Sequence, residues 1–198
     1  MVIPGYLNEL DHSVFLFLNG WHSPVIDLVM YWGTQKLVWF PLFLLMLYFT
    51  IRIYRLNTIT IILVFIITIT ISDQSANIAK SNVQRLRPSN DPRISEQVHV
   101  VNGYRGGQFG FYSSHASNTM AIAIFLILLL RSRYRWVAAV LLPWALFMSY
   151  TRVYLGVHYP GDLLTGMIAG AVIGWLGAQL CGYLISLRFF DRSDSTEA

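Results

Sequence analysis

Long runs without a charged residue limit how this chain can fold more than any other feature. A spanning helix needs roughly 20 apolar residues, or fewer when flanking Lys or Arg side chains reach the interface. Charged residues make up only 12% of the chain, too few to cover a water-exposed surface. The sequence therefore predicts an all-α integral membrane protein, a bundle of five or six transmembrane helices. The charge-free runs are 37–51, 56–72, 106–130, 136–151 and 163–187, with a weaker one at 12–26.

The stretch 13–33 contains Gly20, Pro24 and Asp27, so it is either a sixth span or a pair of interfacial helices. We expect one membrane-embedded domain over 1–187, with 1–35 as its N-terminal interfacial helices or first span. Residues 73–112 are the longest interruption between spans and are predicted to be a functional loop region. The polar segment 188–198 is predicted to be a cytoplasmic tail.

Arginines in the short connections predict the orientation. They lie after the first span, between the third and fourth spans, and after the last span, and the positive-inside rule assigns such sites to the cytoplasm. Alternation then places 73–112 and 152–162 on the outer face. The net charge of +4 in so apolar a chain suggests contact with anionic lipid or phosphate rather than nucleic acid. The connecting arginines are Arg52, Arg55, Arg131, Arg133, Arg135, Arg188 and Arg192.

The first cluster of functional residue types is KSNVQRLRP, with Lys80, Arg85, Arg87 and Pro88. Lys80 and Arg87 are seven residues apart, or two helical turns, so both can project from one face of a helix end. We expect the helix to stop at Pro88, because the residue before proline avoids the α region. Such cations suit a phosphate, although a basic patch against lipid head groups is an alternative.

The second cluster is YSSHAS, directly before the third strong span. Ser113 or Ser114 is a natural N-cap, and a helix start presents free N–H groups and the positive end of the dipole to an anion. His115 would lie in the first turn, where it could hold a proton beside a bound anion. A capping serine pair with an incidental histidine is the alternative.

The third cluster is TRVYLGVHYPGD, in which Arg152, His158 and Asp162 are separated by six and four residues. A carboxylate at that spacing can bind one imidazole nitrogen, fix the tautomer and leave the other nitrogen free to attack. An interfacial His–Asp hydrogen bond with a neighbouring Arg is the alternative. The topology brings all three clusters to one membrane face, as phosphoryl transfer through a histidine requires. We find no metal-binding or cofactor motif in the sequence.

These residues resemble the type 2 phosphatidic acid phosphatases, also called lipid phosphate phosphatases. The family signature K-x6-R-P, P-S-G-H and S-R-x5-H-x3-D is similar to three segments of this chain. They are Lys80 to Pro88, Tyr112 to His115, and Thr151 to Asp162. Tyr112 and Ser114 replace the usual proline and glycine, and Thr151 replaces serine. The resemblance covers about residues 10–187 and implies an outward-facing active site at the helix ends.

The resemblance implies a metal-independent phosphatase without a cofactor. His158 would be the nucleophile that forms a phosphohistidine, Asp162 would orient it, and His115 would be the general acid that later activates water. The phosphate would be held by Lys80, Arg87 and Arg152, with Ser113 and the backbone of Ser114 and His115 completing the cradle. Arg85 lies outside the signature and is treated as auxiliary, and His12, His22 and His99 are assigned to interface or loop positions.

A site at the membrane surface implies a lipid-linked phosphate as substrate. We expect undecaprenyl diphosphate first, with lipid A, phosphatidylglycerol phosphate or phosphatidate as alternatives. A lipid phosphotransferase and a non-catalytic lipid-phosphate binding scaffold are further alternatives. The expected location is a bacterial cytoplasmic membrane, with the site on the periplasmic or extracellular side. Aromatic residues at positions 104, 109, 111 and 112 are expected to line the lipid entrance, and the sequence leaves the oligomeric state open.

Three glycines in the last span, Gly166, Gly170 and Gly174, recur every four residues. Small residues at this spacing let two helix backbones approach closely in lipid. We expect this stripe to pack against the span that carries His115, with a homodimer contact as the alternative.

Overall fold

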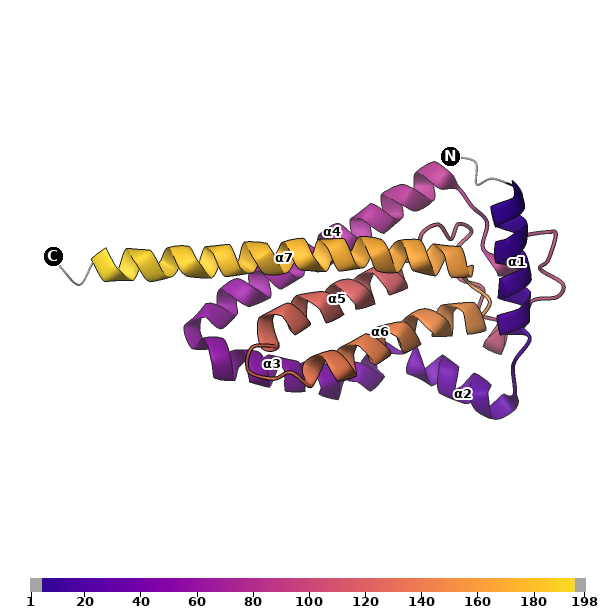
Figure 1. Cartoon of the computed structure of the whole chain (residues 1–198). Coiled ribbons are helices and arrows are strands. Elements are labelled where there is room, and N and C mark those ends of the chain that lie inside the picture. The colour runs from indigo at the N-terminus through magenta and orange to yellow at the C-terminus, as the bar shows by residue number, and fades with distance from the viewer. Residues whose placement is uncertain (1–4, 195–198) are drawn as a thin grey trace.

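The computed structural model describes residues 5–194, with side chains described for 6–187, and is all-α (Figure 1). Seven helices are joined by short 3-10 turns and one long loop. The helices are α1 (Gly5–Asn19), α2 (Pro24–Gly33), α3 (Phe40–Tyr54), α4 (Thr58–Val83), α5 (Ser114–Leu130), α6 (Val137–Tyr154) and α7 (Pro160–Asp194).

Five of these helices, α3 to α7, run along the bundle as the charge-free segments predict (Figure 1). Three stretches are long and apolar enough to cross a membrane, namely Lys36–Val83, Val137–Tyr154 and Pro160–Leu187. The first stretch reverses at Arg55, whose φ of 47° ends α3, so it supplies two helices. Helix α5 is a shorter apolar helix of 17 residues, about 26 Å long at 1.5 Å per residue.

The N-terminal segment forms a pair of short helices rather than a sixth span. Helices α1 and α2 have 15 and 10 residues, fewer than a crossing needs. The chain breaks between them because Ser23 caps α2 and Pro24 occupies its first turn, where a missing N–H does no harm. Helix α1 lies across one end of the bundle (Figure 1). Of the two alternatives for 13–33, the structure has the helix pair, and its place at a membrane interface stays a prediction.

Two predicted boundaries are wrong. Residues 73–83, predicted to belong to the loop region, are the outer end of α4, and the loop covers 84–113. The predicted tail at 188–198 begins as helix, because α7 continues to Asp194 with no breaking residue after 187, and residues 195–198 lie outside the described part. In both places polar sequence continues a helix beyond its apolar part, so hydropathy alone misplaces the end.

Helix α7 packs directly on α5 through the glycine stripe, which confirms the expected packing. A Cβ added at Gly166 would lie 2.7 Å from the carbonyl oxygen of Ser113, and one at Gly174 would lie 2.5 Å from that of Ala121. A Cβ at Gly170 would overlap the backbone of Ser117. The absence of side chains lets the two backbones touch, and van der Waals contact then holds the helices together in lipid.

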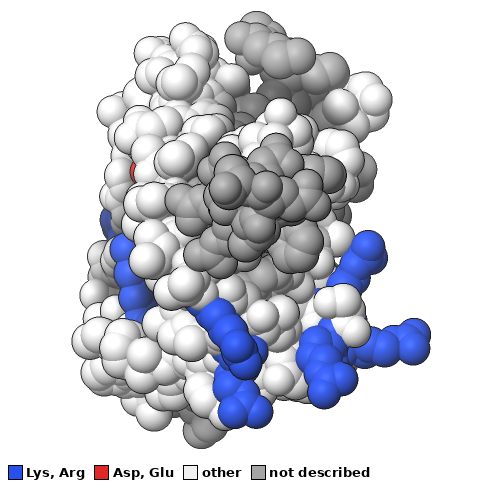
Figure 2. All heavy atoms as spheres, turned by 90° about the vertical axis from the view of Figure 1, so that its left-hand side faces the viewer, with Lys and Arg blue, Asp and Glu red and all other residues white. Residues whose placement is uncertain are grey.

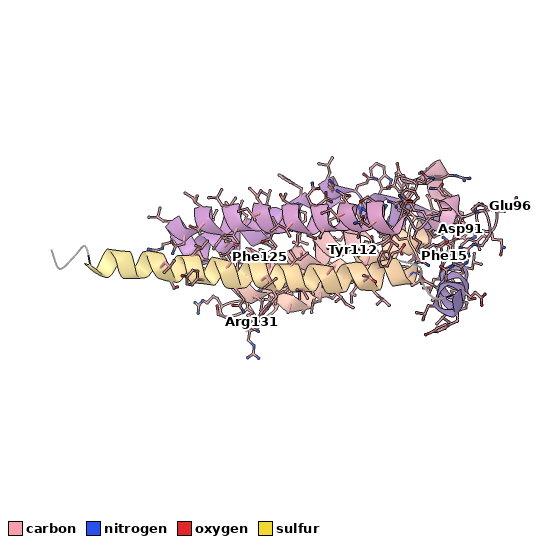
Figure 3. The ribbon with its side chains drawn as sticks, turned by 90° about the horizontal axis from the view of Figure 1, so that it is seen from above. Phe15, Asp91, Glu96, Tyr112, Phe125 and Arg131 are labelled. Carbon is pink, nitrogen blue, oxygen red and sulfur yellow. The ribbon has the colours of Figure 1, made fainter. Side chains whose placement is uncertain are left out.

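The centre of the bundle is a continuous apolar core shared by α3 to α7. Its fully buried members come from α3, α5, α6 and α7, and they include Met46, Phe125, Leu141 and Cys181. In Figure 3, Phe125 lies along the bundle, and Tyr112 lies just before the first residue of α5. A second core, around Phe15 and Tyr159, joins α1 to the start of α7. The N-terminal helix is thereby attached to the end of the bundle where the three sequence clusters meet.

The opposite end of the bundle is basic. Among the residues that Figure 2 colours, Lys and Arg side chains lie around this end, with almost no acidic ones. Arg52 and Arg55 are exposed at the α3–α4 turn, and Arg131, Arg133 and Arg135 are exposed at the α5–α6 turn. Two of the three connections that the sequence predicts to share one membrane face therefore lie at one end of the molecule, while the side chains of Arg188 and Arg192 lie outside the described part of the chain.

We predict that Gly170→Leu lowers the melting temperature in detergent micelles by roughly 5 °C or more and reduces the expected phosphatase activity with it. Overpacking costs about 1–3 kcal/mol, and each kcal/mol shifts the midpoint by about 2–4 °C in a chain of this size. Gly182→Leu on the same helix is the control, because a Cβ there meets no atom within 4 Å. Equal melting temperatures for the two variants would contradict the role assigned to the stripe.

Candidate active site

The three sequence clusters meet around one cavity of about 440 Å³ at the end of the bundle near α1. Its walls come from α3 and the segment before it, from α4, α5 and α6, from the 84–113 loop and from the turn before α7. The predicted site residues that line it are Arg87, Ser114, His115, Arg152 and His158. Lys80 contacts the wall through Ser114, while Ser113 and Asp162 lie behind it.

His158 lies in the turn between α6 and α7 and is only 2% exposed. Its Nδ1 is 3.4 Å from Oδ2 of Asp162, long for a hydrogen bond, and its Nε2 is 3.0 Å from Nη1 of Arg87. A guanidinium can only donate, so Nε2 accepts and the neutral ring carries its hydrogen on Nδ1, toward Asp162. This arrangement leaves an unprotonated Nε2 at the cavity, as a nucleophile requires.

The protonation of His158 follows from its burial. Burial lowers its pKa to about 4; the Asp162 carboxylate opposes this shift and the Arg87 guanidinium adds to it. The imidazole is therefore neutral at neutral pH. Burial and the nearby Arg152 guanidinium also lower the pKa of Arg87. The cavity thus combines a neutral histidine with two arginines, Arg87 and Arg152, that have no carboxylate partner among the described residues.

Asp162 is fully buried in the first turn of α7, and its carboxylate is held from three sides. Oδ1 accepts a bond of 2.8 Å from Nη1 of Arg85, and Oδ2 accepts one of 3.1 Å from the backbone N–H of Tyr159. Oδ2 also faces His158. Arg85 therefore supplies the countercharge that a buried carboxylate requires.

Arg85, treated as auxiliary from the sequence, is a central contact of the site. Its Nη2 is 2.7 Å from Oδ2 of Asp11 and 3.0 Å from Oδ1 of Asn8, both on α1. Its guanidinium carbon lies 3.9 Å from the centre of the Tyr159 ring. Asp11 also accepts from the N–H of Gly161 at 2.8 Å, which caps α7. No sequence signal links Asp11 to Arg85, because they are 74 residues apart and belong to different segments.

Arg87 does not lie on the helix that carries Lys80, contrary to the prediction. Helix α4 ends at Val83, and Gln84 adopts a left-handed conformation with a φ of 51°. Beyond it the chain pairs with the returning loop, since Arg87 N–H donates to the Gln108 carbonyl at 3.1 Å. The guanidinium donates to the Phe109 and Val157 carbonyls at 3.1 and 3.2 Å. Backbone pairing within the loop thus positions this arginine.

Glycines bring the loop close to the histidine. A Cβ at Gly110 would lie 3.1 Å from Oδ2 of Asp162 and 3.5 Å from Nδ1 of His158. Gly106 has a φ of +66°, and a Cβ there would lie 3.1 Å from Nη1 of Arg87. The loop can therefore cover the histidine and both charged groups only where it has no side chain.

Ser113 and Ser114 have different roles at the start of α5. Ser113 is buried and caps the helix, accepting from the N–H of Ala116, while its own N–H donates to the carbonyl of Asp162 at 3.1 Å. The Ser114 hydroxyl accepts from the Lys80 ammonium. A glycine at 114, as in the family signature, could not make this contact. The serine pair thus joins α5 to α4 and α7.

Arg152 is 2% exposed, and sequence reasoning missed its partners. Its Nη1 donates to Oγ1 of Thr34 and its Nη2 to the hydroxyl of Tyr104, each at 3.0 Å. Lys36, an exposed cation before α3, also lines the cavity. Thr34 and Lys36 escaped notice because they stand in the ambiguous N-terminal region and belong to no motif.

Of the aromatic loop residues predicted to line the lipid entrance, Tyr104 lines the cavity. Tyr112 is instead buried, and its hydroxyl donates to Oγ of Ser75 at 2.8 Å. His12, His22 and His99 lie outside the cavity wall: His99 bonds Asp27 at 2.8 Å, and its ring stacks on that of His22. In the described part of the chain, no three His, Cys, Asp or Glu side chains are grouped so as to hold a metal ion.

Comparisons with known proteins agree with this fold and site. Residues 59–186 match the model of the PAP2 superfamily. A lipid A 4'-phosphatase from Bacteroides thetaiotaomicron is 44% identical over 174 residues, covering 86% of this chain and 76% of that protein. One from Porphyromonas gingivalis is 31% identical over 194 residues, covering 88% and 79%. An undecaprenyl-diphosphatase from Sulfolobus acidocaldarius is 28% identical over 146 residues, covering 74% and 65%.

A solved structure has the same fold. The transmembrane PAP2-type phosphatidylglycerolphosphate phosphatase from Bacillus subtilis matches with a TM-score of 0.68 at 20% identity, covering 89% of this chain and 86% of that one. The fold and the sequence matches together define a membrane lipid phosphatase. The chain belongs to the PAP2 superfamily.

We predict that Arg85→Met destabilises the protein by about 3 kcal/mol, because it leaves the buried Asp162 carboxylate without its countercharge. Activity should fall with it, and Arg85→Lys should restore part of both. Arg93→Met is the matched control: Arg93 also pairs with an aspartate, Asp91, but its side chain is 62% exposed. Asp91 is buried, but without the Arg93 guanidinium it still accepts from the Tyr159 hydroxyl and from the backbone N–H of residue 93. A pair whose cation is in water contributes about 1 kcal/mol or less. Equal losses in equilibrium unfolding of the two Met variants would contradict the central role of Arg85.

Proposed function

We propose that this protein removes a phosphate from lipid A through a phosphohistidine intermediate, without a metal ion. The observation that carries the proposal is the neutral His158, held between the Asp162 carboxylate and the Arg87 guanidinium at the cavity wall. A protein that only binds lipid phosphate would need the cations but not this buried pair. The intact pair therefore favours an enzyme over a scaffold.

In the first step, Nε2 of His158 attacks the phosphorus in line, and the bond from phosphorus to the lipid oxygen breaks. The phosphate offsets the Arg87 and Arg152 charges that disfavour a protonated His115, so His115, on the same cavity wall, takes up a proton as substrate binds and donates it to the leaving oxygen. The Arg87 guanidinium contacts the attacking Nε2, so it must turn from this nitrogen to the phosphate oxygens when substrate binds. The positive charge that develops on His158 is stabilised by Asp162.

In the second step, water attacks the phosphohistidine, and the bond from phosphorus to Nε2 breaks to release inorganic phosphate. His115 takes a proton from this water and is ready to act as an acid again. Arg87, Arg152 and Lys80 offset the charge on the phosphoryl oxygens in both steps. Ser113 contributes by capping α5, and Ser114 by orienting the Lys80 ammonium.

Lipid A is the substrate that the relatives favour. The two relatives at 44% and 31% identity are lipid A 4'-phosphatases, whereas the undecaprenyl-diphosphatase is less similar and matches over a shorter stretch. We therefore place lipid A ahead of undecaprenyl diphosphate, which the sequence analysis placed first.

The first test is phosphate release by purified protein in detergent micelles. We expect the highest kcat/KM on lipid A, well above those on undecaprenyl diphosphate and phosphatidate, and persistence of activity in EDTA. His158→Ala should reduce turnover to background while it keeps the melting temperature, because it removes the attacking nitrogen. A preference for another lipid would refute the substrate, and retained turnover in His158→Ala would refute the nucleophile.

We further propose that the site faces the periplasm from a bacterial inner membrane. The arginine-rich end of the bundle, which Figure 2 shows, is the end away from the cavity. Figure 3 shows Glu96 and Arg131 toward opposite ends. In intact cells, Glu96→Cys should react with a membrane-impermeant thiol reagent, and Ser132→Cys should not. Both positions are exposed, and the native Cys181 is buried. The reverse pattern would turn the site toward the cytoplasm.

A further inference from the structure

A carboxylate and an amide line the cavity below the phosphate-binding groups, and the mechanism uses neither. Asp73 lies on α4, seven residues before Lys80, and Asn118 lies on α5, four residues after Ser114. Helix α4 ends at the site and α5 begins there, so both residues lie deeper in the bundle. At 1.5 Å per residue they are about 10 Å and 6 Å below the phosphate level.

The contacts of Asp73 determine how Asn118 is oriented. Oδ1 of Asp73 accepts from Nδ2 of Asn118 and Oδ2 accepts from Nδ2 of Asn77, each at 3.2 Å. A flipped Asn118 amide would turn its oxygen against the carboxylate, so its Nδ2 is held toward Asp73. In the described part of the chain, Oδ1 of Asn118 is buried and has no hydrogen-bond partner.

This pair is costly to maintain if it serves packing alone. An ionisable side chain within a spanning segment is expensive, and a buried acceptor without a partner costs about 1–3 kcal/mol. A hydrogen bond of 2.7 Å between the Ser72 and Ser117 hydroxyls already joins α4 to α5. Each serine directly precedes one member of the pair in the sequence. The Asp73 carboxylate at the cavity wall can only accept, and the Asn118 oxygen still needs a donor, so the pair suits a ligand group that carries hydrogen-bond donors.

The cavity is therefore layered. Below Asp73 and Asn118 the wall becomes apolar, with Ile69 one turn deeper on α4, Ile122 one turn deeper on α5, and Phe43 from α3. From the outer end inward, the layers are cations and histidines, then acceptors, then hydrocarbon. A ligand that fits has a phosphate, a donor-bearing group and an acyl chain in that order.

We propose that Asp73 and Asn118 form a specificity subsite for the sugar ring that carries the scissile phosphate, binding its hydroxyl or amide N–H groups. The proposal rests on the proposed function, since lipid A is a phosphorylated and acylated glucosamine disaccharide. A prenyl diphosphate would place a second phosphate or hydrocarbon at this level, and phosphatidate would place ester oxygens there. The carboxylate disfavours each of these groups.

The experiment compares kcat/KM on lipid A with kcat/KM on p-nitrophenyl phosphate and phosphatidate, which offer no donor at this level. Asp73→Asn removes the charge and lets the new amide take up Oδ1 of Asn118, while Asn118→Leu deletes that oxygen at similar volume. Each variant should lower kcat/KM on lipid A by about tenfold or more, as expected for one hydrogen bond to a charged or buried group. The kcat/KM values on the other two substrates should change by less than about twofold, because indirect effects between independent sites are of this size.

Two control variants separate substrate recognition from packing. Gln74→Leu makes a similar polar-to-apolar change on the exposed face of α4 and should leave all three values unchanged. Ser117→Ala breaks the neighbouring contact between α4 and α5, and it should lower the melting temperature without changing the ratio of the values.

The outcomes distinguish the two proposals. If wild-type protein hydrolyses lipid A and the Asp73 and Asn118 variants lose activity equally on every substrate, the pair is structural; the subsite is overturned while the proposed function stands. If wild-type protein hydrolyses phosphatidate or a prenyl diphosphate but not lipid A, the proposed substrate is wrong and the sugar subsite fails with it. A selective loss on lipid A, with Gln74→Leu unchanged, supports both.

Discussion

The buried ion pair between Asp162 and Arg85 is the interaction on which the rest of the site depends. A carboxylate with no exposed surface must keep a cation beside it, and Arg85 is that cation, at 2.8 Å. The same guanidinium binds Asp11 on α1 and lies over the ring of Tyr159. One charge requirement therefore positions the N-terminal helix, the loop after α4 and the start of α7 around His158.

Close helix packing provides the second constraint. The glycine stripe of α7 brings its backbone against α5, so the first turns of the two helices meet, and the Ser113 N–H bonds the Asp162 carbonyl. His115 lies in the first turn of α5, and His158 lies two residues before α7. The contact between the two helix starts therefore brings both histidines to the same cavity. In lipid, apolar side chains gain little free energy by moving from the hydrocarbon into the protein interior. Close van der Waals contact between helices therefore takes the place of the hydrophobic effect.

The electrostatic balance of the cavity suits its proposed ligand. Arg87 and Arg152 are both nearly buried, and their contacts at the wall are with carbonyls, hydroxyls and the ring of His158. Neither has a carboxylate partner among the described residues. A phosphate would satisfy both, and it would also draw Arg87 from Nε2 of His158, the nucleophile that we propose. The proposed mechanism therefore couples substrate binding to exposure of this nitrogen.

The sequence alone determined the five long helices and the residue types of the site. Charge-free runs reveal spans because lipid excludes charge, and the spacing from His158 to Asp162 is local enough to be read along one turn. Tertiary structure decided the rest. The partners of Arg85, Arg152 and Asn118 come from 45 or more residues away. The loop draws Arg87 off α4, and the acceptor layer exists only where α4 meets α5. Such contacts depend on how whole helices pack, which no local pattern encodes.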